Sequence, residues 1–267
     1  MILRIIFIIL CAGTAFNTEA KAQVFLEQAK VILAVSGGDH PNGTILIHNT
    51  SSESEVIRVY WEDFEYKPPY DGGKNFLPAG TAPASASQWV AFSPQTFTVP
   101  AMGQQLIDYT VTVPSEINEG HYGVLFFETS SNREIDDKAV NLVTRVGSLF
   151  FIEPKNKLKK AVLRDFALKT DSLTANFVNQ GNVILIPHTT FYLMKNAGLV
   201  FLRGDSKKLY VPPGVSAPLV IALKEKLPQG HYTLVINSDL DEGDVVVKEI
   251  GLAADAGGQL TIESTQD

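Results

Sequence analysis

The stretch that decides the fold is Leu106-Ile107-Asp108-Tyr109-Thr110-Val111-Thr112-Val113. From Ile107 onward every second residue is apolar. Successive side chains of an extended chain point to opposite sides, so these apolar residues share one face. This alternation predicts a strand with one face on a core and the other toward water.

Short apolar stretches of the same kind recur along the chain, separated by turn residues such as Pro41-Asn42-Gly43 and Asp71-Gly72-Gly73. We expect strands at Lys30–Val35, Gly43–His48, Val56–Trp61, Thr96–Val99, Gln105–Val113, Gly120–Thr129, Val140–Ile152, Ala161–Lys169, Leu173–Asn179, Val183–Ile186, Thr189–Met194, Leu199–Leu202, Leu219–Leu223, Gly230–Asn237 and Val245–Ile250. No long helical period follows residue 22. The sequence therefore predicts an all-β protein of the sandwich or barrel type.

One pattern occurs twice in the chain: a strand closed by asparagine, then a Val-Pro turn, then Gly-His-Tyr at the start of an apolar strand. The copies are Asn49, Val99–Gly103 and Gly120–Tyr122 in the first half, and Asn179, Val211–Gly214 and Gly230–Tyr232 in the second. Two copies of one plan predict two similar domains. We expect two immunoglobulin-like β-sandwich domains in tandem, residues 23–153 and 154–267, the second ending in a polar tail.

The N-terminus has the features of a secretory signal peptide covering residues 1–22. Arg4 precedes the apolar run Ile5–Leu10, and Ala20-Lys21-Ala22 supplies a small-x-small cleavage site. The run is too short for a membrane span, which needs about 20 apolar residues. We expect a mature chain from Gln23 that is periplasmic or otherwise exported, with no membrane span.

Charge and cysteine content exclude several functions. The net charge of −7 argues against a nucleic-acid partner, which would need a basic patch. Cys11, the one cysteine, lies in the signal peptide, so the mature chain has no disulfide and no thiolate site. Leu10 precedes it, whereas lipid attachment needs a small residue there.

No motif indicates catalysis or a cofactor. The five histidines lack the close spacing of a zinc site, and no Gly-x-Ser-x-Gly occurs. The acidic pairs Glu62-Asp63 and Asp136-Asp137 fit a strand or a solvated loop better than a glycosidase. The acidic run Asp239–Asp244 fits a hairpin turn better than a calcium loop. We therefore predict a non-enzymatic protein with no catalytic residue, metal or cofactor.

Several aromatic residues and irregular segments have structural interpretations. Tyr122 and Tyr232 resemble the tyrosine corner of Greek-key sandwiches, in which the hydroxyl ties back to a loop. Trp61 and Trp89 fit core packing better than a ligand platform. The segment Tyr66–Gln88 is rich in proline and glycine and predicts a long loop, with or without a short edge strand. The tail after Ala253 is either loose or carries one more strand, over 259–263.

The stretch Ala139–Phe151 is apolar on both faces toward its end. The even-numbered residues from Val140 to Phe150 share one face. Before Thr144 the stretch is either an interior strand or an exposed edge. An exposed apolar edge invites pairing, and adding a partner's strand to such an edge is a known mode of recognition.

In its pattern and order, the chain resembles the PapD-like periplasmic pilus chaperones. The features that carry this resemblance are Thr44–Asn49, Phe92-Ser93-Pro94 before Phe97–Pro100, the strand Gly120–Glu128, the long strand Val140–Ile152 ending in Glu153-Pro154, and Asn179–Asn182. The first domain is also similar to the sandwich of WxL-interacting surface proteins.

The resemblance to the pilus chaperones implies a binding site. In that family the long strand complements an incomplete pilus subunit, through positions that fall here on Val140, Leu142 and Thr144. Two basic residues of the family anchor the subunit's terminal carboxylate. One anchor position falls on Leu149, which has no charge, and Arg145 lies four residues earlier on the same face. Lys30, before Val31-Ile32, corresponds to the other anchor.

These observations lead to one functional expectation and one alternative. We expect a periplasmic chaperone-like protein that binds an exported, pilus-type subunit by β-strand addition. The alternative is a cell-surface structural or adhesive module that uses the Tyr66–Gln88 loop as its contact surface.

Overall fold

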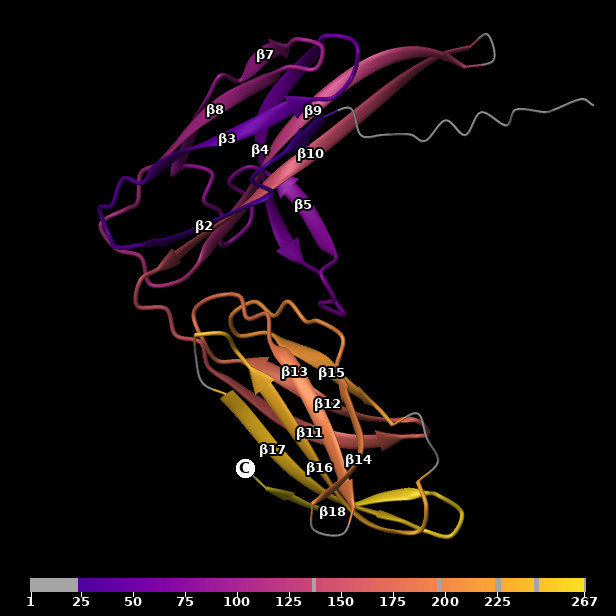
Figure 1. Ribbon diagram of the computed structural model, residues 1–267. Helices are drawn as coiled ribbons and strands as arrows, with labels where there is room; N and C mark the ends of the chain where they lie inside the picture. The colour runs from indigo at the N-terminus through magenta and orange to yellow at the C-terminus, as the bar shows by residue number, and fades with distance from the viewer. Residues whose placement is uncertain (1–23, 136–137, 196–197, 224–226, 243–244, 267) are drawn as a thin grey trace, which may run out of the picture.

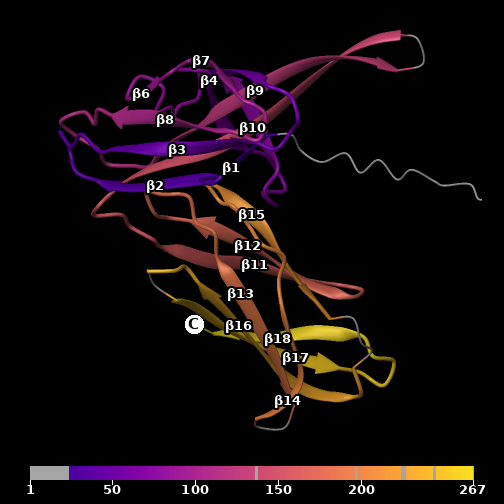
Figure 2. The ribbon, with the colours of Figure 1, turned by 45° about the horizontal axis from the view of Figure 1, so that its top comes forward.

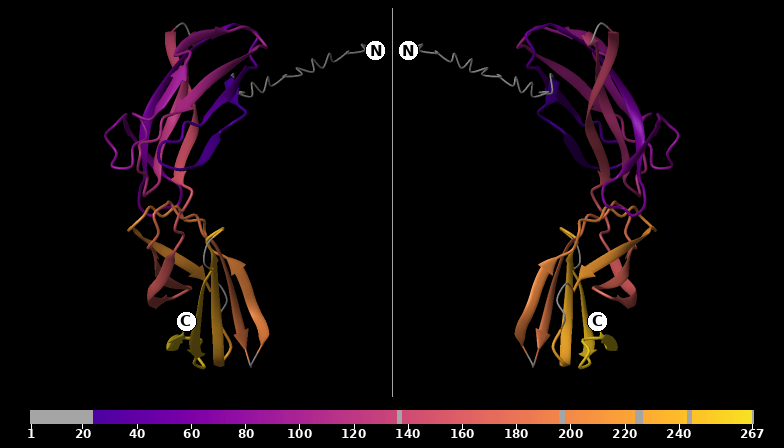
Figure 3. Two further views of the ribbon diagram at one scale, coloured as in Figure 1. Left: turned by 90° about the vertical axis from the view of Figure 1, so that its left-hand side faces the viewer. Right: turned by 90° about the vertical axis from the view of Figure 1, so that its right-hand side faces the viewer.

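The computed structural model describes residues 24–135, 138–195, 198–223, 227–242 and 245–266, and over 131–142 it describes the backbone. The predicted signal peptide, residues 1–22, lies outside the described residues. The described chain contains strands, turns and loops, arranged as two tandem β-sandwiches that meet at an angle (Figures 1 and 3). The predicted fold class is confirmed. Nothing in the part of the chain that the structure describes is a helix long and apolar enough to cross a membrane.

Ten strands form the first sandwich, and residues 155–160 connect it to eight strands of the second. The first ten are β1 (Val24–Leu26), β2 (Lys30–Val35), β3 (Asn42–Asn49), β4 (Glu55–Tyr66), β5 (Lys74–Pro78), β6 (Val90–Ser93), β7 (Thr96–Val99), β8 (Gln104–Val111), β9 (His121–Ile135) and β10 (Lys138–Pro154). The others are β11 (Ala161–Lys169), β12 (Ser172–Asn179), β13 (His188–Lys195), β14 (Leu199–Asp205), β15 (Ser216–Ala222), β16 (Gly230–Asp239), β17 (Val245–Ala254) and β18 (Leu260–Gln266). The division between residues 153 and 154 stays a prediction.

Two sheets face each other in the first sandwich, in the orders β1-β3-β8-β6 and β2-β10-β9-β4-β5, with β7 also pairing with β4. The alternation that predicts β8 is confirmed, since Ile107, Tyr109 and Val111 are all buried in the core between the sheets. Burying a side chain such as Ile107 contributes about 1.5–3 kcal/mol. The periodic burial therefore fixes which face of β8 turns inward.

The second sandwich has the sheet orders β11-β12-β15 and β14-β13-β16-β17-β18. The tail carries an edge strand, β18, which pairs with β17. The predicted strand Val183–Ile186 is wrong. That segment forms only an isolated bridge between Leu185 and Val211, and its backbone serves the junction between the sandwiches instead.

The repeated sequence pattern corresponds to a repeated hydrogen-bonding device. The Asn49 side-chain amide donates to the carbonyl oxygens of Glu53 (2.7 Å) and Val99 (3.2 Å). The Asn179 amide donates to those of Val183 and Val211, both at 2.8 Å. Each asparagine thus ties the end of its strand to the Val-Pro turn of its own sandwich. Buried carbonyls of this kind are costly when left unpaired, which explains why both copies keep an asparagine.

The segment predicted as a long loop, Tyr66–Gln88, contains the edge strand β5 and a turn fixed by a buried carboxylate. Asp63 of β4 is fully buried and accepts hydrogen bonds from the Trp61 indole (3.1 Å) and the Ser85 hydroxyl (2.7 Å). It also accepts from the backbone amides of Thr81 (2.9 Å) and Ala82 (3.0 Å). Glu62 points to the opposite face of β4, where it pairs with Arg145 at 3.0 Å.

The tyrosine corner forms in one sandwich only. The Tyr232 hydroxyl donates to the carbonyl of Pro228 at 2.6 Å, as predicted. The prediction is wrong for Tyr122, whose hydroxyl accepts from the backbone amide of Ile184, in the second sandwich, at 2.9 Å. Tyr122 lies in a third apolar cluster, with Phe64, Phe151 and Ile184, which spans the junction. Its ring is therefore used to join the sandwiches.

Candidate functional site: the open edge of β10

β10 has a long edge without a partner. It pairs with β9 from Lys138 to Ile152, but with β2 only from Leu149 to Pro154. Within the described ranges, no strand pairs with β10 on the β2 side over residues 138–148. Figure 2 shows β9 and β10 leaving the sandwich as a long two-stranded ribbon. Of the two alternatives for this stretch, the exposed edge is the one observed before Leu149.

The direction of the backbone groups along this edge follows from one hydrogen bond. The Leu149 amide donates to the carbonyl of Ala29 at 3.0 Å, on the β2 side. Backbone groups alternate in direction along a strand. The amides of Gly147, Arg145 and Val143 therefore face the open side, and those of Thr144 and Val146 face β9. An open row of this kind is a template for another strand.

The side chains on the core-facing side of β10 become more exposed from Phe150 back toward Thr144. Phe150 and Ser148 are both 0% exposed, Val146 is half-buried, and Thr144 is exposed. The register pairs Val140 and Leu142 with Arg133 and Ser131 of β9. Their side chains lie outside the described residues. The open edge thus adjoins a face that continues the core.

Lys30 lies where β2 joins the end of the open edge. The register sets it directly beside Leu149. Its ammonium lies 4.2 Å from the centroid of the Phe151 ring. Burial lowers the pKa of Lys30, and the charge of Glu153 opposes that shift in part. Within the described residues, no carboxylate lies within ion-pair distance of Lys30.

The two other lysines that line the same hollow as Lys30 are paired with carboxylates. Lys157 contacts Glu242 (3.0 Å) and Glu153 (3.7 Å), and Lys159 pairs with Asp241 at 3.6 Å. Together they border a hollow of about 210 Å³ at the junction of the sandwiches. These pairs give Asp241 and Glu242 a structural role. Among the described residues that line the hollow, Lys30 is then the lysine without a carboxylate partner.

Arg145 faces away from this hollow. Its guanidinium pairs with Glu62 at 3.0 Å and stacks over the ring of Phe126, 4.2 Å from its centroid. The structure therefore does not bring Arg145 and Lys30 together as two anchors. The backbone of Arg145 still belongs to the open edge, because its amide faces that side.

Four of the five histidines have a polar partner close by. His121 contacts the carbonyl of Ser85 at 3.2 Å, and His231 lies 2.9 Å from Glu263. His48 pairs with Glu27, and His188 with Asp205. Over the residues that the structure describes, no three His, Cys, Asp or Glu side chains gather as metal ligands would.

Two features of the site were missed by the sequence reasoning. One is the direction of the edge amides, which only the register with β2 reveals. The other is the pairing of Lys157 and Lys159 with Glu242 and Asp241. The opposite charges of residues 155–160 and of the 239–244 turn were a usable signal for that contact.

Comparison with known proteins gives a likeness in fold. No protein-family model matches the sequence, and no curated protein does. Among solved structures, a chain of a chaperone–tip adhesin complex of CFA/I fimbriae biogenesis aligns at a TM-score of 0.53 and 13% identity, covering 85% of this chain and 97% of that one. The class 5 fimbriae chaperone CfaA aligns at 0.52 and 12% identity, covering 84% and 97%.

The fold therefore has the two-sandwich architecture that is also seen in the fimbrial chaperone CfaA. At these identities the likeness concerns the fold alone, and it extends over both sandwiches.

Proposed function

We propose that this protein is a periplasmic chaperone-like protein that binds an exported, pilus-type subunit by β-strand addition along residues 138–148 of β10. The observation that carries the proposal is the open edge of β10 beside an uncovered core face. Backbone hydrogen bonds would give affinity, and Val140, Leu142 and Thr144 would meet the partner's apolar groove. The action is binding rather than catalysis.

Lys30 supports the same proposal. It lies at the end of the open edge, has no carboxylate partner among the described residues, and sits beside apolar Phe151. An incoming carboxylate at this place would gain a charge-assisted bond in a partly desolvated setting. We assign Lys30 as the single anchor and exclude the Arg145 side chain, because Glu62 occupies it.

The experiment begins with an affinity pull-down. The tagged mature protein, Gln23 to Asp267, is incubated with its native envelope fraction, and captured proteins are identified by mass spectrometry. The proposal predicts a stoichiometric exported subunit. Val140→Asp combined with Leu142→Asp should abolish its capture.

A proline substitution tests the backbone mechanism itself. Val143→Pro deletes an amide that faces the open side and spares the ladder with β9, as proline on an edge strand can. Val143→Ala keeps that amide and removes the exposed side chain. We expect capture to fail with proline and to persist with alanine. Equal capture by both variants, or equal loss, would exclude strand addition at this edge.

The alternative, a surface module using the Tyr66–Gln88 loop, has no specific observation in its favour. Much of that segment is held by pairing of β5 with β4 and by Asp63.

A further inference from the structure

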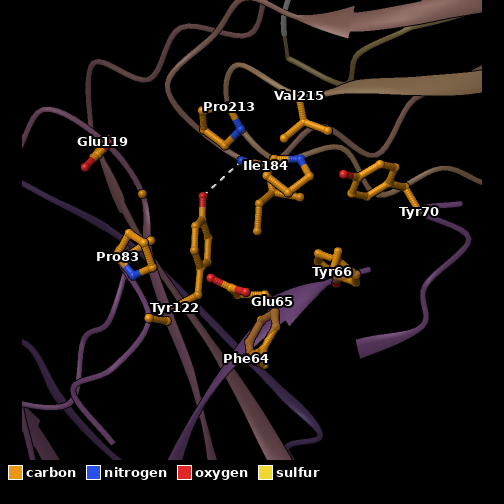
Figure 4. Close-up of a pocket in the computed structure, with 14 residues that line it drawn as sticks. Phe64, Glu65, Tyr66, Tyr70, Pro83, Glu119, Tyr122, Ile184, Pro213 and Val215 are labelled. Atoms are coloured by element: carbon orange, nitrogen blue, oxygen red, sulfur yellow. Dashed lines mark hydrogen bonds between the residues drawn. The ribbon is translucent and has the colours of Figure 1, made fainter. Parts of the chain in front are cut away.

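A cavity of about 400 Å³ lies at the junction of the two sandwiches, apart from the β10 edge. Figure 4 shows the rings of Tyr66, Tyr70 and Tyr122 around it, with Pro213 and Val215 closing it from the second sandwich. Its volume falls in the range of small-molecule sites, roughly 300–1,000 Å³.

The walls are aromatic and apolar. Phe64, Tyr66 and Tyr122 are each less than a tenth exposed, and Ile184 completes the wall from the second sandwich. Aromatic faces carry negative potential and attract cations. The same ring system already holds an ammonium of this chain, since Lys74 lies 4.8 Å from the centroid of Tyr66 and 5.9 Å from that of Tyr210.

The polar groups that line the cavity are acidic or phenolic. They are the carboxylates of the exposed residues Glu65 and Glu119 and the hydroxyls of Tyr66, Tyr70 and Tyr122. The Tyr122 hydroxyl accepts from the Ile184 amide at 2.9 Å, whereas within the described chain the carboxylates of Glu65 and Glu119 and the hydroxyl of Tyr70 have no hydrogen bond or ion pair. No lysine or arginine lines the cavity. Its charge therefore complements a cation.

Tyr70 is held in an unusual backbone conformation. Its φ of 67° lies in the left-handed region, which a residue with a bulky side chain rarely adopts. The Tyr210 amide donates to the Tyr70 carbonyl at 2.8 Å and helps to fix this conformation. The result is a phenol presented at the cavity, where Figure 4 shows its oxygen turned inward.

We propose that this cavity binds a small organic cation with an apolar body. The ammonium would lie against the tyrosine rings and the Glu65 and Glu119 carboxylates, and the apolar part against Ile184, Pro213 and Val215. Both sandwiches supply walls, so the ligand would also hold them together. The site is separate from the β10 edge and does not depend on the proposed chaperone function.

The test uses benzylamine, which is protonated at neutral pH, and benzyl alcohol as its neutral isostere. Binding to the mature protein is measured by ligand-observed NMR titration. We expect benzylamine to bind about tenfold more tightly than benzyl alcohol, because only the cation gains the ring and carboxylate interactions. Equal affinities would overturn the proposal, as would no binding of benzylamine.

Three variants locate the site. Glu65→Gln combined with Glu119→Gln should reduce the preference for benzylamine over benzyl alcohol several-fold, leaving the part that comes from the rings, whereas Glu116→Gln, an exposed change close to Glu119, should not change it. Ala84→Phe fills the cavity and should abolish binding of both probes. Unchanged benzylamine affinity in the double glutamine variant would refute the assignment. Val143→Pro should still bind benzylamine, which separates this result from the fate of strand addition.

Discussion

Replacing Asp63 with alanine should destabilise the first sandwich more than any surface change. The carboxylate is fully buried and accepts four hydrogen bonds, from Trp61, Thr81, Ala82 and Ser85. Each bond to a charged group contributes about 1.5–3 kcal/mol net. Their sum is an upper bound, because water can reach the turn at Thr81 and Ser85, and removing Asp63 also removes the cost of burying a charge. We expect a loss of about 3–5 kcal/mol.

The assay can isolate the first sandwich, because both tryptophans of the chain, Trp61 and Trp89, belong to it. Urea unfolding is followed by tryptophan fluorescence. With a slope of about 2 kcal/mol per molar urea, a loss of 4 kcal/mol lowers the midpoint by roughly 2 M. Far-UV circular dichroism on the same samples reports the strands of both sandwiches, and the part of its signal that does not follow the fluorescence, from the second sandwich, should keep its midpoint.

Two matched variants make the argument specific. Asp63→Asn keeps one oxygen acceptor but presents an amide to two of the donors, so its loss should be intermediate. Asp71→Ala removes an exposed aspartate of the same segment, which accepts one 3.3 Å bond from Gly73, and should change stability by less than about 0.5 kcal/mol. A loss below about 1 kcal/mol for Asp63→Ala would refute the view that this carboxylate fixes the turn.

Three further predictions follow from single contacts. Tyr122→Phe leaves the Ile184 amide without its acceptor and should weaken the junction by about 1–2 kcal/mol. Small-angle scattering should then show a wider range of angles between the sandwiches. Tyr232→Phe is the control and should lower only the stability of the second sandwich. Gly123→Ala places a Cβ against the Trp61 ring, closer than van der Waals contact allows, and should cost about 1–3 kcal/mol by urea unfolding, whereas Gly38→Ala meets no atom within 4 Å and is strained only by its φ of 78°. Lys30→Met should weaken capture of the partner several-fold. It should also raise the stability of the first sandwich at neutral pH. Burial lowers the pKa of Lys30, so the charged form is disfavoured in the folded state, and methionine removes that cost. The gain in stability should shrink as the pH rises from the lowered pKa toward 10.5, because in this range Lys30 of the wild-type protein is neutral when folded and charged when unfolded. A gain that grows with pH would contradict this reasoning.

The sequence was sufficient for the fold class because burial has a period in strands. The alternation in β8 and the doubled Asn49 and Asn179 pattern both depend on contacts within one sandwich. The short strands β1 and β6 were missed, since three or four residues carry too little period to be recognised. The contacts of Tyr122 and Arg145 were beyond sequence reasoning, because their partners come from another sandwich and another strand.

The sequence indicated the strand that carries the candidate site but not the geometry of its open edge. Which half of β10 is open depends on where the N-terminal chain crosses from one sheet to the other. β1 pairs with β3 in the first sheet, and β2 pairs with β10 in the second. The crossing at Glu27–Ala29 therefore sets the length of edge left uncovered.

Gln28 fixes this crossing from both sides. The amide of Leu46, in β3, donates to the Gln28 side-chain oxygen at 3.0 Å, and the Ser148 hydroxyl, in β10, donates to the Gln28 carbonyl at 2.7 Å. Ser148 is fully buried, so this bond is protected from water. A crossing nearer to the N-terminus would let β2 cover more of β10 and close the edge. The hydrogen bonds of Gln28 and Ser148 thus fix the residue at which β2 begins to pair with β10, and this leaves the edge of residues 138–148 unpaired on that side.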